Sequence, residues 1–519
     1  MSQSESPSSQ SPSPKLLPPQ PNLDWLKNRA KERLAELRAT DSSAKLAGSQ
    51  LSIAREYGFT SWRKLKETIE QQRAAAQPDE KQREILLRNF RGAVNRGDTV
   101  ELRRLLESDP FLRKSVNSPV FAFDGRAILH AHDPKTVDLL LEFGADINAK
   151  SSWWAGPWGV LDNADEKTGE FLISRGAKID IFAAANLNKL DVMRNLLDAD
   201  PALVHAKGGD GCRPLHFAKT EEAMDLLLER GGDIDARDVD HESTAAQWAM
   251  PRPPGQGGGM ERGKSLDRVR ALLRRGAQPD VFMAAALNDV PLLRAIVDAN
   301  PGVLEVRIGA KGYARCPDAP GRHIYVYSLM EHKSPLQVAA DFGSRDCLKF
   351  LLSRATPKQK FLCGCLIGDA AMAKAALAES PELMRHLSID DQRALPDAAF
   401  NGTAPAVKLM LDLGFDPLAP GGDTGTSLHC AAWQGNAEIV QMILSHPIAK
   451  KLGDRLVNAV ETTHNGRPLS WCCHGSTMCR NPRGDYPAVA KLLLVAGAIG
   501  ANPDQASDAV RAVLSKTSA

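Results

Sequence analysis

An apolar triplet followed closely by a glycine recurs along most of the chain. It appears as LLLEFGADINA at 139, FLISRGAKIDI at 171, LLLERGGDIDA at 226, LLRRGAQPDV at 272, MLDLGFDPLA at 410 and LLLVAGA at 492. A second form ends in proline, as LLESDP at 105, LLDADP at 196, IVDANP at 296 and ALAESP at 376. Segments of small residues precede many of these runs. The pattern predicts pairs of short helices, the second of which has a leucine-rich stripe.

The glycines of the first form are expected to end each second helix. They stand at positions 144, 176, 231, 276, 414 and 497, where a left-handed residue suits the end of a helix. One helix pair cannot bury its own leucine stripe, so neighbouring pairs must stack. We therefore expect an all-α solenoid.

Three segments carry a more specific signature. RPLHFA at 213, AILHAH at 127 and TSLHCAAWQGNAEIV at 426 resemble the T-P-L-H-x-A motif of ankyrin repeats, whose period is about 33 residues. The resemblance covers residues 84–500, which would hold about twelve units at that period. Most units lack the leading threonine, and the proline-ending units have no L-H. The layout is similar to that of bacterial ankyrin-repeat proteins with a small helical head, and it implies no catalytic residues.

The two ends of the chain differ from the array. Residues 1–21 are rich in Ser, Pro and Gln, so we predict a disordered tail. Residues 22–76 predict three helices: one after Asn22, one from Asp41 or Ser42 to Gly58, and one capped by Thr60 or Ser61. Residues 15–75 hold twelve Lys or Arg against seven Asp or Glu, a net charge of +5. We predict a basic helical head at 22–76 and a helical cap at 501–519.

Four insertions interrupt the predicted array, near residues 150–160, 251–263, 306–333 and 474–487. Insertions in repeat arrays usually lie on one face, often the binding face. In the third insertion, residues 323–329 have the composition of a strand. Aromatic residues and arginine are enriched at binding hot spots. Our candidate partner-binding residues are therefore Trp153, Trp154, Trp158, Arg322, His323, Tyr325 and Tyr327. The alternative is that these side chains only attach the insertions to their own repeats.

Composition narrows the possible functions without selecting one. The 519 residues carry a formal net charge of +2 and 43% hydrophobic residues, so no overall field favours nucleic acid or membrane. No apolar run is long enough to span a membrane. The nine cysteines are scattered, which fits a reducing compartment. We expect a cytoplasmic, monomeric protein that does not bind a membrane.

Residues 258–265 read GGMERGKS and match the phosphate-binding Walker A pattern. That loop must follow a buried strand, whereas the preceding QWAMPRPPGQG is too rich in proline to form one. We favour an insertion loop, followed by an ordinary second helix.

Two further groups suggest chemistry. Cys472, Cys473, His474 and Cys479 form a dense set of potential metal ligands, but adjacent cysteines on a helix point about 100° apart, so we favour packing thiols. The same holds for Cys363 and Cys365. The resemblance to ankyrin repeats implies that His130, His216 and His429 hydrogen-bond neighbouring backbone.

These observations favour a non-catalytic scaffold that binds a protein through the concave face of the array, its hairpin tips and its insertions. No cofactor is implied. Two alternatives stay open: an enzyme that uses the Walker-like loop or the Cys/His cluster, and nucleic-acid binding through the basic head. In the head, an alanine and a glycine at helix-turn-helix spacing support the second alternative, but helix packing needs the same small residues.

Overall fold

The computed structural model describes residues 15, 23–38, 41, 43–254, 264–309, 321–479 and 481–517. Within these ranges the regular elements are helices, and the chain forms no β-sheet beyond isolated bridges such as Arg237 with Thr244. The prediction of an all-α protein is confirmed. No helix in these ranges combines the length and the apolar character that crossing a membrane requires. The predicted tail at 1–21 lies outside the described residues, apart from Lys15.

The chain divides into two compact units. The first contains the described residues up to Ala122 and Arg126–Asp146, and the second contains Phe123–Gly125 and the chain from Ile147 onward. The helices of the first unit are α1 (Leu23–Arg38), α2 (Leu46–Glu56), α3 (Trp62–Arg96), α4 (Thr99–Ser108), α5 (Pro110–Ser115), η2 (Ala127–His130) and α6 (Pro134–Glu142).

The predicted helical head has its own core in the first unit. Its buried residues are Leu26, Ala30, Ile53, Ala54, Leu65 and Ile69. Ser61 caps α3, because its side chain accepts a hydrogen bond from Lys64 N at 3.1 Å. The second helix begins at Leu46 rather than after Asp41, because Asp41 instead accepts a hydrogen bond from Ser43 N at 2.9 Å. Helix α3 runs to Arg96 without ending between 76 and 84, where we expected head and array to separate.

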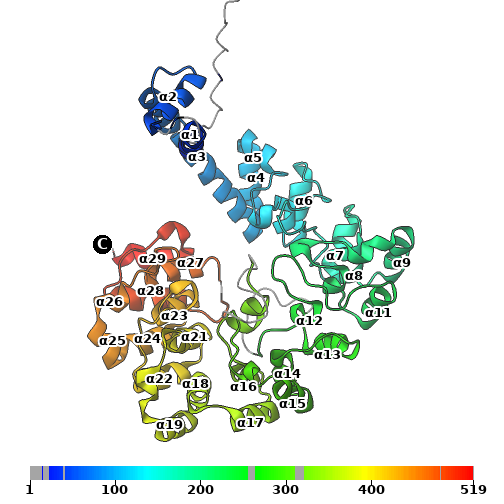
Figure 1. Cartoon of the computed structure of the whole chain (residues 1–519), viewed down its shortest axis with the longest axis vertical. Coiled ribbons are helices and arrows are strands. Elements are labelled where there is room, and N and C mark those ends of the chain that lie inside the picture. Colours follow the sequence, from blue (N-terminus) through cyan, green and yellow to red (C-terminus); the bar gives the residue numbers. More distant parts are fainter. Residues whose placement is uncertain are drawn as a thin grey trace, which may run out of the picture. The chain divides into compact units, whose positions relative to one another are not determined.

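The second unit consists largely of helix pairs that follow one another along the chain (Figure 1). Its first α-helices are α7 (Glu166–Ser174), α8 (Ile181–Asn186), α9 (Leu190–Ala199), α10 (Pro214–Phe217), α11 (Glu221–Glu229), α12 (Ala245–Trp248), α13 (Leu266–Arg274), α14 (Val281–Leu287), α15 (Val290–Ala299), α16 (Pro335–Asp341), α17 (Arg345–Arg354) and α18 (Pro357–Ile367). The remainder are α19 (Ala370–Glu379), α20 (Ile389–Gln392), α21 (Ala394–Phe400), α22 (Ala404–Leu413), α23 (Ser427–Trp433), α24 (Ala437–Ser445), α25 (Pro447–Leu452), α26 (Asp454–Val457), α27 (Pro468–Gly475), α28 (Tyr486–Val495) and α29 (Asp508–Thr517).

Contacts between these helices form two layers. The first helices of successive pairs contact one another, as α8 contacts α10, α14 contacts α16, and α23 contacts α21 and α27. The second helices do the same, as α9 contacts α11 and α24 contacts both α22 and α28. In these pairs, the second helix of one pair thus packs against that of the next, as the repeated pattern predicts.

The two predicted ways of ending a second helix are both present. The six glycines at 144, 176, 231, 276, 414 and 497 have φ values between 83° and 97°, so the prediction of left-handed residues is confirmed. In the proline-ended form, the proline begins a new short helix. Asp200, for example, lies between α9 and the 3-10 helix Pro201–His205, and its side chain accepts a hydrogen bond from Ala202 N at 3.0 Å.

The insertions differ from what their composition suggests. Residues 150–160 contain turns but no helix. The strand that composition favours at 323–329 is wrong, because Val326–Met330 form a π-helix. In the fourth insertion, α27 extends to Gly475 and α28 begins at Tyr486. Residues 255–263 and 310–320, which belong to the second and third insertions, lie outside the described ranges.

Candidate functional site

The seven candidate partner-binding side chains differ in exposure. Trp154 is 53% exposed and Tyr327 is 42% exposed. The Arg322 side chain is 61% exposed and forms an ion pair with Glu331 at 2.9 Å. Trp153 and Trp158 are half-buried. These five therefore have surface within reach of a partner.

Two of the seven, His323 and Tyr325, are fully buried. The hydroxyl of Tyr325 donates a hydrogen bond to Asp280 Oδ2 at 2.8 Å, and its ring packs against Phe282 with centroids 5.8 Å apart. These two side chains belong to the interior, where Tyr325 holds the insertion against the start of α14.

The structure brings the first and third insertions to the same hairpin, residues 238–244, which connects α11 to α12. Tyr327 packs edge-on against the His241 ring, with centroids 5.4 Å apart, and its hydroxyl donates to the Gly321 carbonyl at 2.7 Å. From the first insertion, Trp158 Nε1 donates to Asp210 Oδ1 at 3.3 Å. Segments far apart in the sequence thus meet around this hairpin.

Asp238 shapes the hairpin. Its carboxylate accepts hydrogen bonds from His241 N at 2.5 Å, from Ser243 N at 2.9 Å and from Trp248 Nε1 at 2.8 Å. With its backbone fixed in this way, Glu242 adopts a φ of 47°. Asp238 therefore sets the direction in which the neighbouring Asp240 and His241 side chains point.

Asp210 reaches the hairpin from the turn at 208–211, which reads GGDG. Its φ is 56°, and its carbonyl accepts hydrogen bonds from Val239 N at 2.9 Å and Asp240 N at 3.1 Å. Trp158 covers this turn so closely that a Cβ added at Gly209 would lie 2.0 Å from the indole Cδ2. The turn and the hairpin are therefore joined through backbone.

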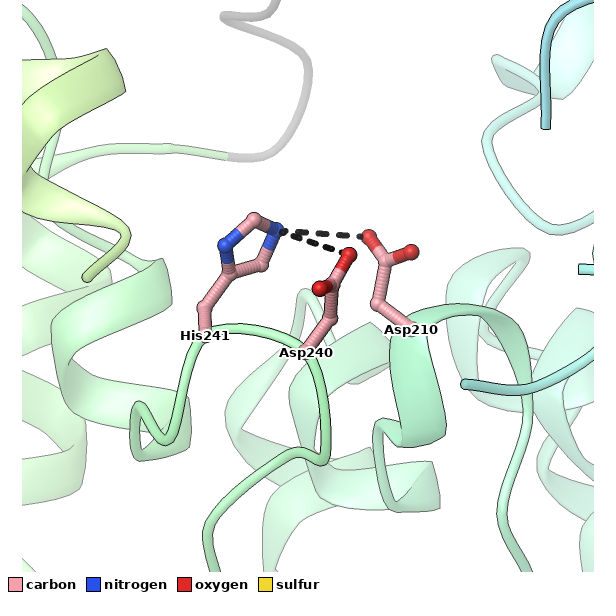
Figure 2. A group of neighbouring side chains, drawn as sticks. All are labelled: Asp210, Asp240 and His241. Carbon is pink, nitrogen blue, oxygen red and sulfur yellow. Dashed lines mark ion pairs between the residues drawn. The ribbon is translucent and has the colours of Figure 1, made fainter. Parts of the chain in front are cut away.

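Three buried side chains converge here: Asp210, Asp240 and His241 (Figure 2). Nε2 of His241 lies 3.7 Å from Asp210 Oδ2 and 3.9 Å from Asp240 Oδ2. The other ring nitrogen, Nδ1, lies 3.0 Å from the Gly321 carbonyl and 2.7 Å from that of Arg322. Both are acceptors, so Nδ1 carries a proton.

The electrostatics of the cluster follow from these distances. Burial lowers the pKa of His241, but the interaction with Asp210, the bond to the Arg322 carbonyl and the charge of Asp238 together raise it to about 9. Burial raises the pKa of Asp240. Among the described residues, Asp210, Asp240 and His241 are the group whose ligand atoms all lie within 4.8 Å of one another, as metal binding requires.

The predicted cysteine and histidine set does not converge in this way. Cys472 and Cys473 are buried in the core, and Cys472 Sγ lies 3.4 Å from the Tyr486 carbonyl. Cys479 instead contacts Gln434 Oε1 at 3.6 Å. Burial raises the pKa of both Cys363 and Cys365 to about 12. Cys363 and Cys365 therefore pack as protonated thiols near neutral pH.

Only the end of the Walker-like segment is described, since residues 258–263 lie outside the described ranges. Ser265 caps α13 by accepting a hydrogen bond from Arg268 N at 3.1 Å. Lys264 Nζ lies over the Trp248 ring, 5.5 Å from its centroid. The described residues before the segment, from Ala245 to Pro254, form a short helix and coil rather than a strand.

The three L-H histidines contact backbone, as the resemblance implies. His216 Nδ1 accepts a hydrogen bond from Arg213 N at 3.1 Å, and its Nε2 lies 3.1 Å from the Ser243 carbonyl. His429 contacts Thr426 N at 3.1 Å and the Gly466 carbonyl at 3.3 Å. His130 Nε2 lies 3.2 Å from the Ala122 carbonyl. The prediction of a structural role is confirmed, and His216 and His429 each tie one helix pair to the following hairpin.

The family comparison matches one of these units. Residues 425–451 fit the model for the ankyrin repeat, and this range contains α23, α24 and His429. The chain thus carries an ankyrin repeat, in which His429 performs the backbone contacts described above.

Our interpretation of the sequence missed Asp210, Asp240 and His241, although an internal repetition marks the hairpin that carries Asp240 and His241. DVDHESTAAQW at 238 parallels ETTHNGRPLSW at 461. In the second copy, Glu461 accepts hydrogen bonds from His464 N at 2.8 Å and Gly466 N at 2.7 Å, as Asp238 does in the first. His464 is exposed and lies 4.0 Å from Asp423 Oδ2. The same hairpin is therefore used twice, once open to solvent and once covered by insertions.

Proposed function

We propose that the chain is a non-catalytic scaffold that binds a protein partner through an array of ankyrin units. The ankyrin repeat at 425–451 carries this proposal, because such repeats bind proteins through surface residues of a stacked array. Support for further units across 84–500, about twelve at the usual period, comes from the recurring helix pairs, the left-handed glycines and the histidine contacts at 130 and 216.

The exposed aromatics around the 238–244 hairpin are the part of the array that we assign to partner contact, together with the concave face and the other hairpin tips. Trp154 and Tyr327 come from two insertions and are exposed, and Arg322 lies beside them with an exposed side chain. Tryptophan, tyrosine and arginine supply much of the binding energy in protein interfaces. The array is held by buried hydrogen bonds and loses little entropy when it binds.

A catalytic role has less support. The buried thiols stay protonated, and the L-H histidines are engaged with backbone. We therefore propose that no covalent chemistry takes place on this chain, and that it acts in the cytoplasm.

Capture of partners by the immobilised full chain tests the proposal. The double variant W154A/Y327A should lose a partner that the unchanged chain retains, while I389A should retain it, because Ile389 is 66% exposed but lies outside the insertions. Equal retention by W154A/Y327A would remove these aromatics from the binding surface. Capture of nucleic acid alone, with a steep loss at higher salt, would favour the basic head instead.

A further inference from the structure

We propose that Asp210, Asp240 and His241 bind one divalent transition-metal ion of the Zn²⁺ class, which fixes the third insertion onto the 238–244 hairpin. The ligands come from the 208–211 turn and from the hairpin, and the insertion supplies the backbone carbonyls that orient the histidine. This proposal is independent of the partner-binding function.

The donor set favours this class of ion. One imidazole nitrogen and two carboxylate oxygens are ligands that Zn²⁺ and its neighbours accept, whereas Ca²⁺ and Mg²⁺ prefer sites made of oxygen alone. The potential ligand atoms all lie within 4.8 Å of one another. The site holds three protein ligands and leaves a fourth position for water, as in many zinc sites.

The spacing of the three groups also suits an ion. The Nε2–Oδ2 distances of 3.7 and 3.9 Å exceed the about 2.7–3.2 Å of a hydrogen bond. Two ligands of one tetrahedral Zn²⁺, with bonds of about 2.0–2.1 Å, lie about 3.3 Å apart. A contraction of a few tenths of an ångström would bring both carboxylates to that distance from Nε2, and the distance between the two carboxylate oxygens is at most 4.8 Å.

The histidine is oriented as a metal ligand usually is. Its Nδ1 proton faces the Gly321 and Arg322 carbonyls, and Nε2 faces the two carboxylates (Figure 2). Metal-bound histidines commonly donate their other ring N–H to a carbonyl or carboxylate in this way. Trp158 donates to Oδ1 of Asp210, which leaves Oδ2 directed at the cluster.

The state of Asp240 is a separate observation that points to a cation. Its side chain is only 4% exposed, and its side-chain hydrogen-bond donor among the described residues is the indole of Trp153. Its closest cationic neighbour there is His241, at 3.9 Å. A buried carboxylate with so few partners is costly, and a bound ion would reduce that cost.

The second hairpin provides a matched control within the same chain. At the position of Asp240 it has Thr463, and its histidine, His464, is largely exposed beside Asp423. It therefore repeats the hairpin with one carboxylate fewer and without the covering insertion. We expect this hairpin not to bind the ion with comparable affinity.

The test uses tag-free full-length protein that has been stripped with a chelator. Zn²⁺ is titrated by calorimetry and Co²⁺ by absorption, since thiolate ligands would add a strong near-ultraviolet charge-transfer band. We expect one ion per chain and no such band. Loss of a residue that only hydrogen-bonds to a metal ligand weakens metal binding by roughly 10–100-fold. H241A, which removes a ligand itself, should weaken binding by more than that. D240N, which is nearly isosteric, should weaken binding at least tenfold, whereas H464A should leave it unchanged.

Saturating Zn²⁺ should also raise the unfolding midpoint of the unchanged chain but not that of D240N, because an ion bound only by the folded state stabilises it. Circular dichroism checks that each variant is folded. If H241A does not fold, the metal affinity of D240N alone tests the proposal. Absence of Zn²⁺ and Co²⁺ binding would overturn the proposal and leave an imidazolium paired with two carboxylates. A thiolate band, or equal affinity in D240N, would overturn it as well.

Discussion

The Asp238 carboxylate stabilises the hairpin at residues 238–244 by accepting three hydrogen bonds. It is 3% exposed and accepts hydrogen bonds from His241 N, Ser243 N and Trp248 Nε1. D238A would leave three buried donors without their acceptor, at about 1–3 kcal/mol for each group. Because neighbouring losses are not additive, we expect the free energy of unfolding to fall by about 2–4 kcal/mol, measured by urea unfolding.

The control for D238A is D267A. The Asp267 side chain is 92% exposed and forms an ion pair with Arg270. Exposed ion pairs contribute about 0–1 kcal/mol to stability. A loss in D238A no larger than that in D267A would show that solvent replaces the carboxylate without cost.

Gly209 and Gly422 occupy matching positions in the turns GGDG and GGDTG, yet their surroundings differ. A Cβ at Gly209 would lie 2.0 Å from the Trp158 ring, whereas a Cβ at Gly422 meets nothing within 4 Å. G209A should displace Trp158 and lower stability by about 1–3 kcal/mol, the usual cost of overpacking. G422A should leave the unfolding midpoint nearly unchanged. Thermal unfolding followed by tryptophan fluorescence measures both, and equal midpoints would contradict the packing of Trp158 on this turn.

The exposure of individual aromatic residues could not be predicted from composition. We chose His323, Tyr325 and Tyr327 as candidates because their residue types are common at binding hot spots, and composition does not distinguish which of them is buried. The segment has no neighbouring strand to pair with, and it folds into a π-helix that buries Tyr325 and exposes Tyr327. β-Propensity reflects packing against neighbouring strands, and here those neighbours are helices.

Several helices in this chain begin with a capping box, and the one at His429 makes stability depend on pH. Burial lowers the pKa of His429 from 6.5 to about 4. Since the unfolded chain binds the proton first, stability is present above about pH 6.5 and is lost as pH falls toward 4. The loss should reach about 2–3 kcal/mol at pH 4.5, at about 1.4 kcal/mol per unit of pKa shift.

H429Q tests this prediction, because glutamine already fills the same capping position in α12, where Gln247 Oε1 accepts a hydrogen bond from Thr244 N at 3.0 Å. The H429Q variant should keep the helix cap, but it has no imidazole that takes up a proton when the chain unfolds. The difference in unfolding free energy between the two proteins, measured at pH 7 and pH 4.5, should therefore change by about 2–3 kcal/mol. Parallel pH profiles would show that His429 does not titrate on unfolding.

At the level of elements, the sequence predicted interiors better than boundaries. Leucine stripes and terminal glycines identified second helices such as α11 and α22, because both signals are local. The end of the helical head was not predictable in the same way. Pro78 favours a helix end at the preceding residue, yet α3 runs through it to Arg96. The metal-type cluster was missed because its residues come from two turns, and only the fold makes them neighbours.

The second unit contains two large hydrophobic cores that meet at α18. The first extends along the chain from Ile181 to Cys363 and the second from Phe361 to Leu514. Helix α18 gives Cys363 to one core, and Phe361 and Cys365 to the other. Because stacked helix pairs contact mainly their neighbours, stability in this unit should be divided between the two cores.

The two matching hairpins allow this division to be tested, since one belongs to each core region. Asp238 organises the hairpin before α12, and Glu461, which is 2% exposed, organises the one before α27. D238A should lower hydrogen-exchange protection mainly in α10 to α12, and E461A mainly in α23, α27 and α28. Each change should fade with distance along the stack, because coupling passes from one helix pair to the next. If either variant lowers protection equally on both sides of α18, the unit unfolds as one cooperative body, and the covered and open hairpins share a single stability despite their different surroundings.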